Sequence, residues 1–191
     1  DDRVAAGAGF PTHPHRDMEI VSFVLDGALE HRDSMGNGSV IRAGDVQRMS
    51  AGTGVAHSEF NPSKEEDTRF LQIWLLPSEH GIEPGYAQKF FEPEERRGRL
   101  KLLVSPGGRD GSIDINSDAR IYGALLDDGE AVEQDLGPGR VGYLQVARGA
   151  VEVDGEVLAE GDGASLSDRD RLEIRGKDSA EILLFDLPAA A

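Results

Sequence analysis

Short runs rich in Val, Ile, Leu, Phe and Tyr are separated by Gly- and Pro-containing segments at intervals of roughly eight to twelve residues. The runs at residues 19–27 and 69–77 are predicted to be strands, and the second is expected to be fully buried because it is almost continuously apolar. Residues 28–45 read as a β-hairpin with a type I′ turn at Asn37-Gly38. This pattern is typical of a sandwich or barrel of many short strands.

The second half of the chain repeats the pattern of the first. Residues 85–106 are polar and interrupted by proline, so they are predicted to cross between two halves. In each half a strand ends at glycine, a hairpin follows, and a Gly-Asp turn opens the next strand; the matching segments are Gly27-Ala28-Leu29-Glu30 with Gly44-Asp45, and Gly149-Ala150-Val151-Glu152 with Gly161-Asp162. The second hairpin is shorter and turns at Asp154-Gly155. We therefore expect a duplicated barrel, with domains at residues 1–90 and 91–191.

Composition narrows the functions that such a barrel can have. The 191-residue chain contains no cysteine, which excludes disulfides and thiolate metal sites, so a bound metal must use imidazole and oxygen ligands. Its net charge of -16 repels phosphate backbones and argues against direct nucleic-acid binding. No apolar run approaches the ~18 residues of a membrane-spanning helix, and the first ten residues lack a secretion signal. A cytoplasmic protein without membrane contact is expected.

Two pairs of polar residues predict a metal site in the first half. His13 and His15 point the same way if the segment is extended, and Pro14 between them favours extension. The same alternation joins His57 to Glu59 in a second strand. Three imidazoles and one carboxylate would hold a single divalent metal, but these ligand types do not choose among Fe(II), Mn, Ni, Cu and Zn.

Other readings of these residues stay open at this point. A His-x-His pair alone is more often a solvated strand edge than a metal site. Glu19 shares the strand parity of His13 and His15 and competes with Glu59 to be the carboxylate ligand. His31 is expected to contact a ligand or to line the pocket, without binding the metal, and His80 is expected in a surface loop. The second half contains no histidine, so any metal chemistry belongs to the first.

Two spaced motifs resemble those of the cupin superfamily. Gly7-x5-His13-x-His15-x3-Glu19 is similar to its first motif, and Gly44-x5-Ser50-x-Gly52 followed by His57-x3-Asn61 is similar to its second. Ser50 stands where that motif usually has proline, and four residues, where the motif usually has two, separate Gly52 from His57. The block at residues 10–61 closely resembles the pirin branch of the cupins, and the similarity is strong over about residues 3–86.

The resemblance implies an all-β bicupin, with two double-stranded β-helix (jelly-roll) barrels of which only the first binds metal. It implies one metal, typically iron, held by His13, His15, His57 and Glu59, with Glu19 nearby as a non-ligand. N-terminal strands are expected to precede Asp1, and a monomer is expected because the two barrels can cover each other.

The resemblance also implies an activity. Some pirin-like proteins are quercetin 2,3-dioxygenases, which open flavonols with O2 and release carbon monoxide. The alternative is a redox-responsive, iron-binding regulator that acts through a protein partner, and a third reading is a purely structural metal.

Catalysis would need a base and an apolar cleft. Glu59 is the candidate base as well as a ligand, with Glu19 in reserve. The residues proposed to line a cleft for a planar aromatic substrate are Phe10, Met18, Phe23, Met49 and Phe60, although for any single one of them ordinary barrel core is the favoured interpretation.

Overall fold

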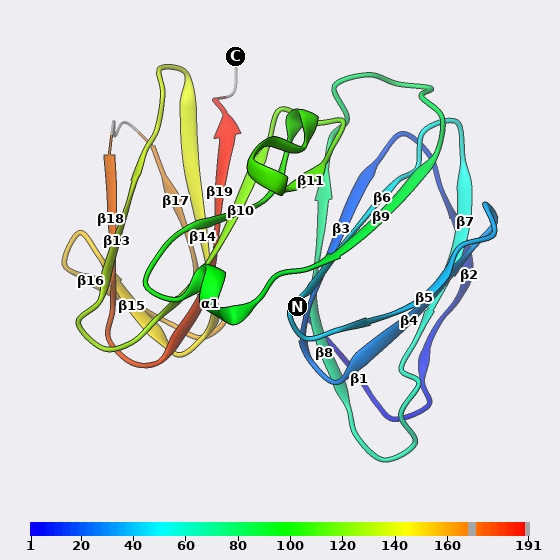
Figure 1. Cartoon of the computed structure of the whole chain (residues 1–191), viewed down its shortest axis with the longest axis horizontal. Helices are drawn as coiled ribbons and strands as arrows, with labels where there is room; N and C mark the ends of the chain where they lie inside the picture. The colour runs from blue at the N-terminus through cyan, green and yellow to red at the C-terminus, as the bar shows by residue number, and fades with distance from the viewer. Residues whose placement is uncertain (168–170, 190–191) are drawn as a thin grey trace. The chain divides into compact units, whose positions relative to one another are not determined.

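The computed structural model describes residues 1–167 and 171–189 and divides into two compact units (Figure 1). The first unit comprises Asp1–Phe91 and Ile113–Ser117, and the second comprises Glu92–Ser112 and Asp118–Ala191. Both are built almost entirely from antiparallel strands, so the predicted all-β fold with two barrels is confirmed. None of the helices in the described residues has the length and apolar character needed to cross a membrane.

The first unit contains two antiparallel sheets. Their strand orders are β1-β8-β3-β6-β9 and β2-β7-β4-β5. The strands of this unit are β1 (Asp2–Val4), β2 (Gly9–His15), β3 (Glu19–Asp26), β4 (Ala28–Asp33), β5 (Gly38–Arg42), β6 (Asp45–Ser50), β7 (Val55–Phe60), β8 (Thr68–Leu75), β9 (Gly85–Phe90) and β11 (Ile113–Asp114). The two apolar runs predicted as strands are β3 and β8. The prediction that the second run is fully buried is wrong, because Trp74 and Leu76 are exposed at its end.

The interior of the first unit is apolar at two levels and polar between them. Along one face of β3, Ile20 packs in one apolar cluster and Val24 in another, with Ser22 between them. Ser22 is paired in register with Gln47 on β6 and Gln72 on β8, so the three side chains form a polar row across the sheet. This face of the sheet faces β2 and β7, because the Gln72 amide reaches the Glu59 carboxylate.

The second unit has the same two-sheet construction. The strands that belong to this unit follow one another in the orders β10-β12-β19-β14-β17 and β13-β18-β15-β16. The elements are α1 (Pro93–Arg96), β10 (Lys101–Ser105), the 3-10 helix η1 (Pro106–Gly111), β12 (Arg120–Leu126), β13 (Ala131–Asp135), β14 (Arg140–Arg148), β15 (Ala150–Val153), β16 (Glu156–Ala159), β17 (Gly163–Leu166), β18 (Arg171–Gly176) and β19 (Ala180–Pro188). One continuous apolar cluster fills it.

The internal echo in the sequence corresponds to repeated backbone geometry. Gly27 has φ 69° just before β4, and Gly149 has φ 68° just before β15. A Cβ at Gly149 would lie 2.2 Å from the Ser179 carbonyl oxygen, so the turn requires glycine for space as well as for its left-handed conformation. The later pair, Gly44 at φ 92° and Gly161 at φ 90°, matches in the same way.

Two local predictions differ in outcome between the halves. The predicted turn at Asp154-Gly155 is confirmed, because these two residues alone separate β15 from β16, and both have the positive φ of a type I′ turn. The type I′ turn at Asn37-Gly38 is wrong, because β4 ends at Asp33, Gly38 begins β5, and the left-handed residue is Gly36. The Asp33 carboxylate accepts backbone N–H groups in this loop, which stabilises a longer turn than the Asn-Gly signal predicts.

The segment at residues 85–106 is more regular than predicted. It contains β9, α1 and β10, and β9 pairs with β6 along its whole length. Its polar residues are compatible with an edge strand, which is exposed along one side.

Candidate metal centre

The imidazoles of His13, His15 and His57 converge because β2 and β7 are hydrogen-bonded neighbours. His13 lies opposite His57 in the register, and His15 lies two residues farther along β2 on the same face. The Nε2 atom of His57 is 3.0 Å from His13 Nε2 and 3.1 Å from His15 Nε2. Three ring nitrogens therefore surround one point.

The spacing of these nitrogens fits a metal ion. Two nitrogens at right angles, each about 2.1 Å from a common ion, lie about 3.0 Å apart, whereas tetrahedral ligands lie about 3.4 Å apart. The two distances to His57 Nε2 match the right-angled arrangement. The side chain of His13 is oriented for this role, because its Nδ1–H donates to the Pro11 carbonyl at 2.8 Å and leaves Nε2 without a proton.

The environment favours the neutral form of two of these imidazoles, His57 and His15. Burial, together with the neighbouring rings of His13, His15 and His31, lowers the pKa of His57 to about 3. Burial and the His13 ring also lower the pKa of His15. Neutral imidazoles are the form that binds metal, so the cluster is poised for a cation near neutral pH.

A buried carboxylate accompanies the histidines. Glu59 is 2% exposed, and its Oε2 lies 4.0 Å from His57 Nε2. Gln72 Nε2 donates to Glu59 Oε2 at 2.9 Å, while the buried Oε1 of Glu59 has no protein partner. A buried, unpartnered carboxylate oxygen beside three imidazoles is suited to an ion.

Two further groups surround the cluster. The fully buried His31 has its Nδ1 3.4 Å from His57 Nδ1, and its ring lies 5.0 Å from the Tyr86 ring. His31, His57 and Glu59 also each offer a ligand atom within 4.8 Å of one another. At the exposed side, the Trp74 ring meets the His15 ring edge-on at 5.1 Å, and Trp74 Nε1 donates to Gln72 Oε1 at 3.1 Å.

Comparisons with known proteins identify the chain's relatives. A family model described as pirin matches residues 1–75, and one described as the quercetinase C-terminal cupin domain matches residues 102–187. Quercetin 2,3-dioxygenase of Escherichia coli K12 is 44% identical over 189 residues, which is 98% of this chain and 80% of that protein. The chain belongs to the pirin family.

Solved structures of pirins agree with the fold. YhhW from Escherichia coli has a TM-score of 0.95 and 42% identity, over 100% of this chain and 80% of that one. The bacterial pirin YhhW in complex with nickel(II) has a TM-score of 0.93 and 41% identity, over 99% of this chain and 80% of that one. The expected family and the bicupin architecture are thus confirmed.

In this pirin, Glu19 and Phe23 lie on the opposite face of β3 from Ser22 and the polar row. Glu19 is fully buried, and its Oε2 accepts hydrogen bonds from Ser50 Oγ and Asn116 N. Burial raises its pKa. Strand alternation therefore places neither Glu19 nor Phe23 beside the three imidazoles, contrary to the expected proximity.

The other residues proposed to line a cleft are divided between core and surface. Met49 is 1% exposed and packs with Ile20, and Met18 packs partly buried against the same cluster. Phe10 and Phe60 are 38% and 36% exposed on the neighbouring strands β2 and β7. Phe60 lies on the face of β7 opposite His57 and Glu59, so of these five residues Phe10, which is paired with Glu59 in the register, presents exposed apolar surface on the face of the site. His80 is exposed, as predicted for a surface loop.

Sequence reasoning missed Gln72 and Trp74 in the pirin site. Gln72 was the one polar residue inside the apolar run at 69–77, which is a signal that β8 contacts something other than a core. Trp74 is the chain's single tryptophan and is 54% exposed, two residues along the same face. Both contacts depend on the packing of one sheet against the other.

Proposed function

We propose that this pirin is a mononuclear metal-dependent dioxygenase that opens flavonols such as quercetin with O2, using His13, His15, His57 and Glu59 as metal ligands and Fe(II) as the metal. This proposal depends on one observation. The Nε2 atoms of His13 and His15 lie 3.0 and 3.1 Å from His57 Nε2, beside the buried carboxylate of Glu59. The naming of a 44% identical relative as quercetin 2,3-dioxygenase supports it.

The choice of metal is supported by the right-angled ligand spacing. Such spacing suits ions that accept six ligands, such as Fe(II), Mn and Ni, better than tetrahedral zinc. When bound, the metal supplies a Lewis acid that lowers the pKa of a coordinated hydroxyl and makes the substrate electron-rich. Because a relative was solved with nickel(II), nickel is compared with iron in the experiment below.

Glu59 is suited to accept the proton of the flavonol 3-hydroxyl. Burial raises the pKa of Glu59, opposed by the hydrogen bond from Gln72, so its carboxylate is a better base than an exposed glutamate. The Gln72 amide holds one oxygen in place and leaves the other free. Trp74 holds that amide in turn, so the orientation of Glu59 depends on both.

Recognition of the rings is assigned to exposed aromatic side chains beside the histidines. Trp74 is half-exposed with its ring against His15, and it offers a flat surface to a planar substrate. Phe10, paired with Glu59 between β2 and β7, offers further apolar surface on the same face. In the reaction, both atoms of O2 enter the opened product and one ring carbon leaves as carbon monoxide.

The experiment uses the full chain loaded separately with Fe(II) and Ni(II). Loss of quercetin absorbance, O2 uptake and carbon monoxide release are measured for the wild type, His57→Ala and the control His80→Ala, whose side chain is 73% exposed. For both the wild type and His80→Ala, we expect one molecule of carbon monoxide to be released for each molecule of quercetin consumed. His57→Ala should lose both metal and turnover.

Two outcomes would contradict the proposal. Turnover that persists in metal-free His57→Ala would separate the reaction from this site. A wild type that binds the metal tightly and consumes no flavonol would instead favour a regulatory role.

A further inference from the structure

A chain of buried side chains leads from the β4–β5 loop to His57. His31 Nε2 lies 3.0 Å from Asp33 Oδ2, and His31 Nδ1 lies 3.4 Å from His57 Nδ1. The side chains of His31 and Asp33 are both 0% exposed. The opposite ring nitrogen of His57, Nε2, is the one that faces His13 and His15.

The direction of each hydrogen bond between these side chains follows from the carboxylate of Asp33 at the outer end of the series. A carboxylate can only accept, so His31 Nε2 carries the proton that it shares with Asp33. A neutral His31 then has no proton on Nδ1, and this nitrogen accepts a hydrogen bond from the N–H group at His57 Nδ1. With its proton on Nδ1, His57 presents an unprotonated Nε2 to the other two imidazoles, which is the form that binds a metal.

We propose that Asp33 and His31 are positioning residues that fix the tautomer and ring orientation of His57, so that His57 Nε2 is always available as a metal ligand. This inference rests on the metal site of the proposed function but not on the identity of the substrate. Neither residue touches the reacting atoms in this scheme.

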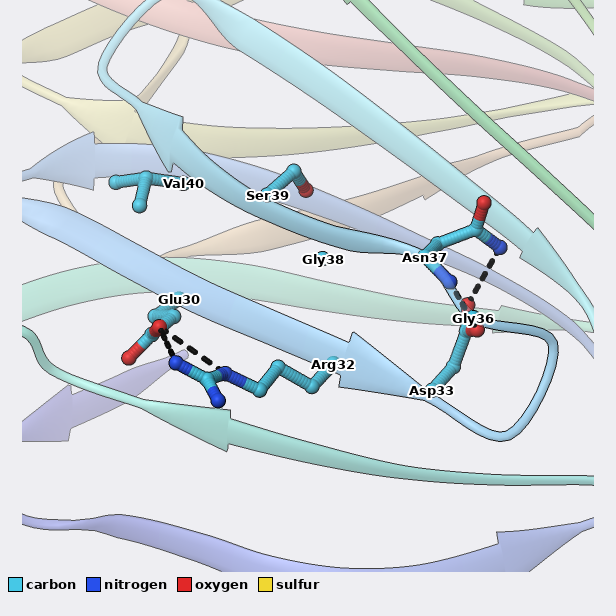
Figure 2. Close-up of a pocket in the computed structure, with 8 residues that line it drawn as sticks. All are labelled: Glu30, Arg32, Asp33, Gly36, Asn37, Gly38, Ser39 and Val40. Carbon is cyan, nitrogen blue, oxygen red and sulfur yellow. Dashed lines mark hydrogen bonds and ion pairs between the residues drawn. The ribbon is translucent and has the colours of Figure 1, made fainter.

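Asp33 is itself held rigidly at the outer end of the chain. Its Oδ1 accepts the backbone N–H groups of Met35 and Asn37, at 2.9 and 3.0 Å, and the Asn37 side-chain Nδ2 donates to Oδ2 at 2.9 Å. Figure 2 shows Asn37 turned toward Asp33 at the end of the hairpin, beside a surface pocket that both residues line. Tyr86 against His31 restrains the ring in the middle of the chain.

The substitution Asp33→Asn gives a sharp prediction because it should reverse the direction of the hydrogen bonds that run from Asp33 through His31 to His57. Two backbone N–H groups keep an oxygen at the Oδ1 position, and the Asn37 amide, which donates to Oδ2 in the wild type, can turn its oxygen toward the substituted group, so the new NH2 group faces His31 Nε2. That NH2 donates, which moves the His31 proton to Nδ1 and the His57 proton to Nε2. A proton then occupies the position that the metal requires.

The experiment measures Ni(II) binding to the full chain by calorimetry. We expect Asp33→Asn and His31→Phe each to weaken Ni(II) binding by about 10–100-fold, as for other residues that orient metal ligands. The matched control is Glu30→Gln, which removes the same charge from β4 where Glu30 pairs with the exposed Arg32. It should change the affinity by less than about twofold.

A double-mutant cycle separates this mechanism from a general loss of structure. In the His31→Phe background, Asp33→Asn has no histidine to act through, so it should cause no further loss of affinity. Equal losses in both backgrounds would overturn the proposal. So would an Asp33→Asn affinity equal to that of Glu30→Gln.

Nitrogen NMR of the imidazoles tests the same point without any substitution. In the metal-free wild type, the His57 proton should lie on Nδ1 and the His31 proton on Nε2. A His57 proton on Nε2 would overturn the proposal even if the variants fail to fold. The site itself is tested separately: loss of Ni(II) binding in His57→Ala with an unaffected Asp33→Asn would reject the positioning role and leave the metal site standing.

Discussion

The two units build their interiors differently on the same framework. After the equivalent turns at Gly27 and Gly149, the fourth residue along is His31 in the first unit and Val153 in the second, and both side chains are buried. The apolar cluster of the second unit is continuous over fourteen residues. In the first unit, two smaller clusters, around Ile20 and around Val24, lie on either side of the polar row.

The difference indicates how much stability a barrel loses when its interior holds a binding site. In the described residues of the first unit, Ser22 Oγ and the Oε1 atoms of Glu19 and Glu59 are buried without a hydrogen-bond partner. Each such group costs roughly 1–3 kcal/mol of stability unless water or a ligand satisfies it. We infer that the second unit, which lacks histidine, stabilises the chain, while the first gives up packing to hold an ion.

The largest expected effect is a pH dependence confined to the first unit. In metal-free protein, unfolded His57 takes up a proton near pH 6.5, whereas the folded pKa is about 3, so stability is complete above pH 6.5 and falls as the pH drops toward 3. The lowered pKa of His15 adds to this loss, and the raised pKa of Glu59 opposes it. The total is expected to be several kcal/mol.

Trp74 allows this pH effect to be measured for one unit alone. It is the single tryptophan of the chain and lies in the first unit, so its fluorescence follows the unfolding of that unit in urea at each pH. His80→Ala, which removes an exposed histidine, is the control and should keep the full slope. A slope between pH 7 and pH 4 that is the same for His57→Gln and the wild type would argue against His57 as its source.

The second prediction is that metal stabilises only the first unit. At a Ni(II) concentration about 100 times the dissociation constant, the stabilisation should be about 2.7 kcal/mol, and a chelator should remove it. Calorimetric unfolding, with Trp74 fluorescence to identify the first unit, measures this difference. An equal shift of both units would mean that the ion binds outside the His13–His15–His57 cluster or that the units unfold together.

The sequence predicted which side chains share a face only where the strand alternation of side chains had to hold over a few residues. His13 and His15 are two residues apart on one strand, so their common face followed directly from the extended backbone. The same rule failed from His15 to Glu19, because Asp17 has φ 45° where the chain passes from β2 to β3 in the other sheet.

Contacts between sheets were not predictable in this way. The Gln72–Glu59 hydrogen bond and the position of Trp74 beside His15 join residues of different sheets, and no local pattern specifies such pairs. The loop at Asp33 was missed for another reason, since a side chain supplies the hydrogen bonds that a two-residue turn would have made in the backbone.

The third prediction tests whether the repeated turns are equally strict. Gly149→Ala should destabilise the second unit by about 2 kcal/mol or more, because its Cβ would meet the Ser179 carbonyl oxygen and its φ is left-handed. Gly27→Ala should do the same in the first unit with a somewhat smaller effect, since the nearest atom, Thr68 Oγ1, is 2.8 Å away. Gly155→Ala is the control, because its Cβ would lie in open space and only backbone strain of about 1 kcal/mol remains. Urea unfolding that ranks Gly155→Ala as the most damaging would contradict the steric argument.

The smallest effect concerns a pair of buried serines, one in each unit. Ser22 Oγ has no partner, so Ser22→Ala should leave the metal-free first unit unchanged or stabilise it by up to about 1 kcal/mol. Ser105 is equally buried, but its Oγ accepts from Arg109 N and is 2.8 Å from Ser112 Oγ, so Ser105→Ala should destabilise the second unit by about 1 kcal/mol. Unfolding in urea measures both. If Ser22→Ala were as damaging as Ser105→Ala, the Ser22 hydroxyl would have to be satisfied by an internal water, and the polar row would cost the first unit less than its unpartnered atoms imply.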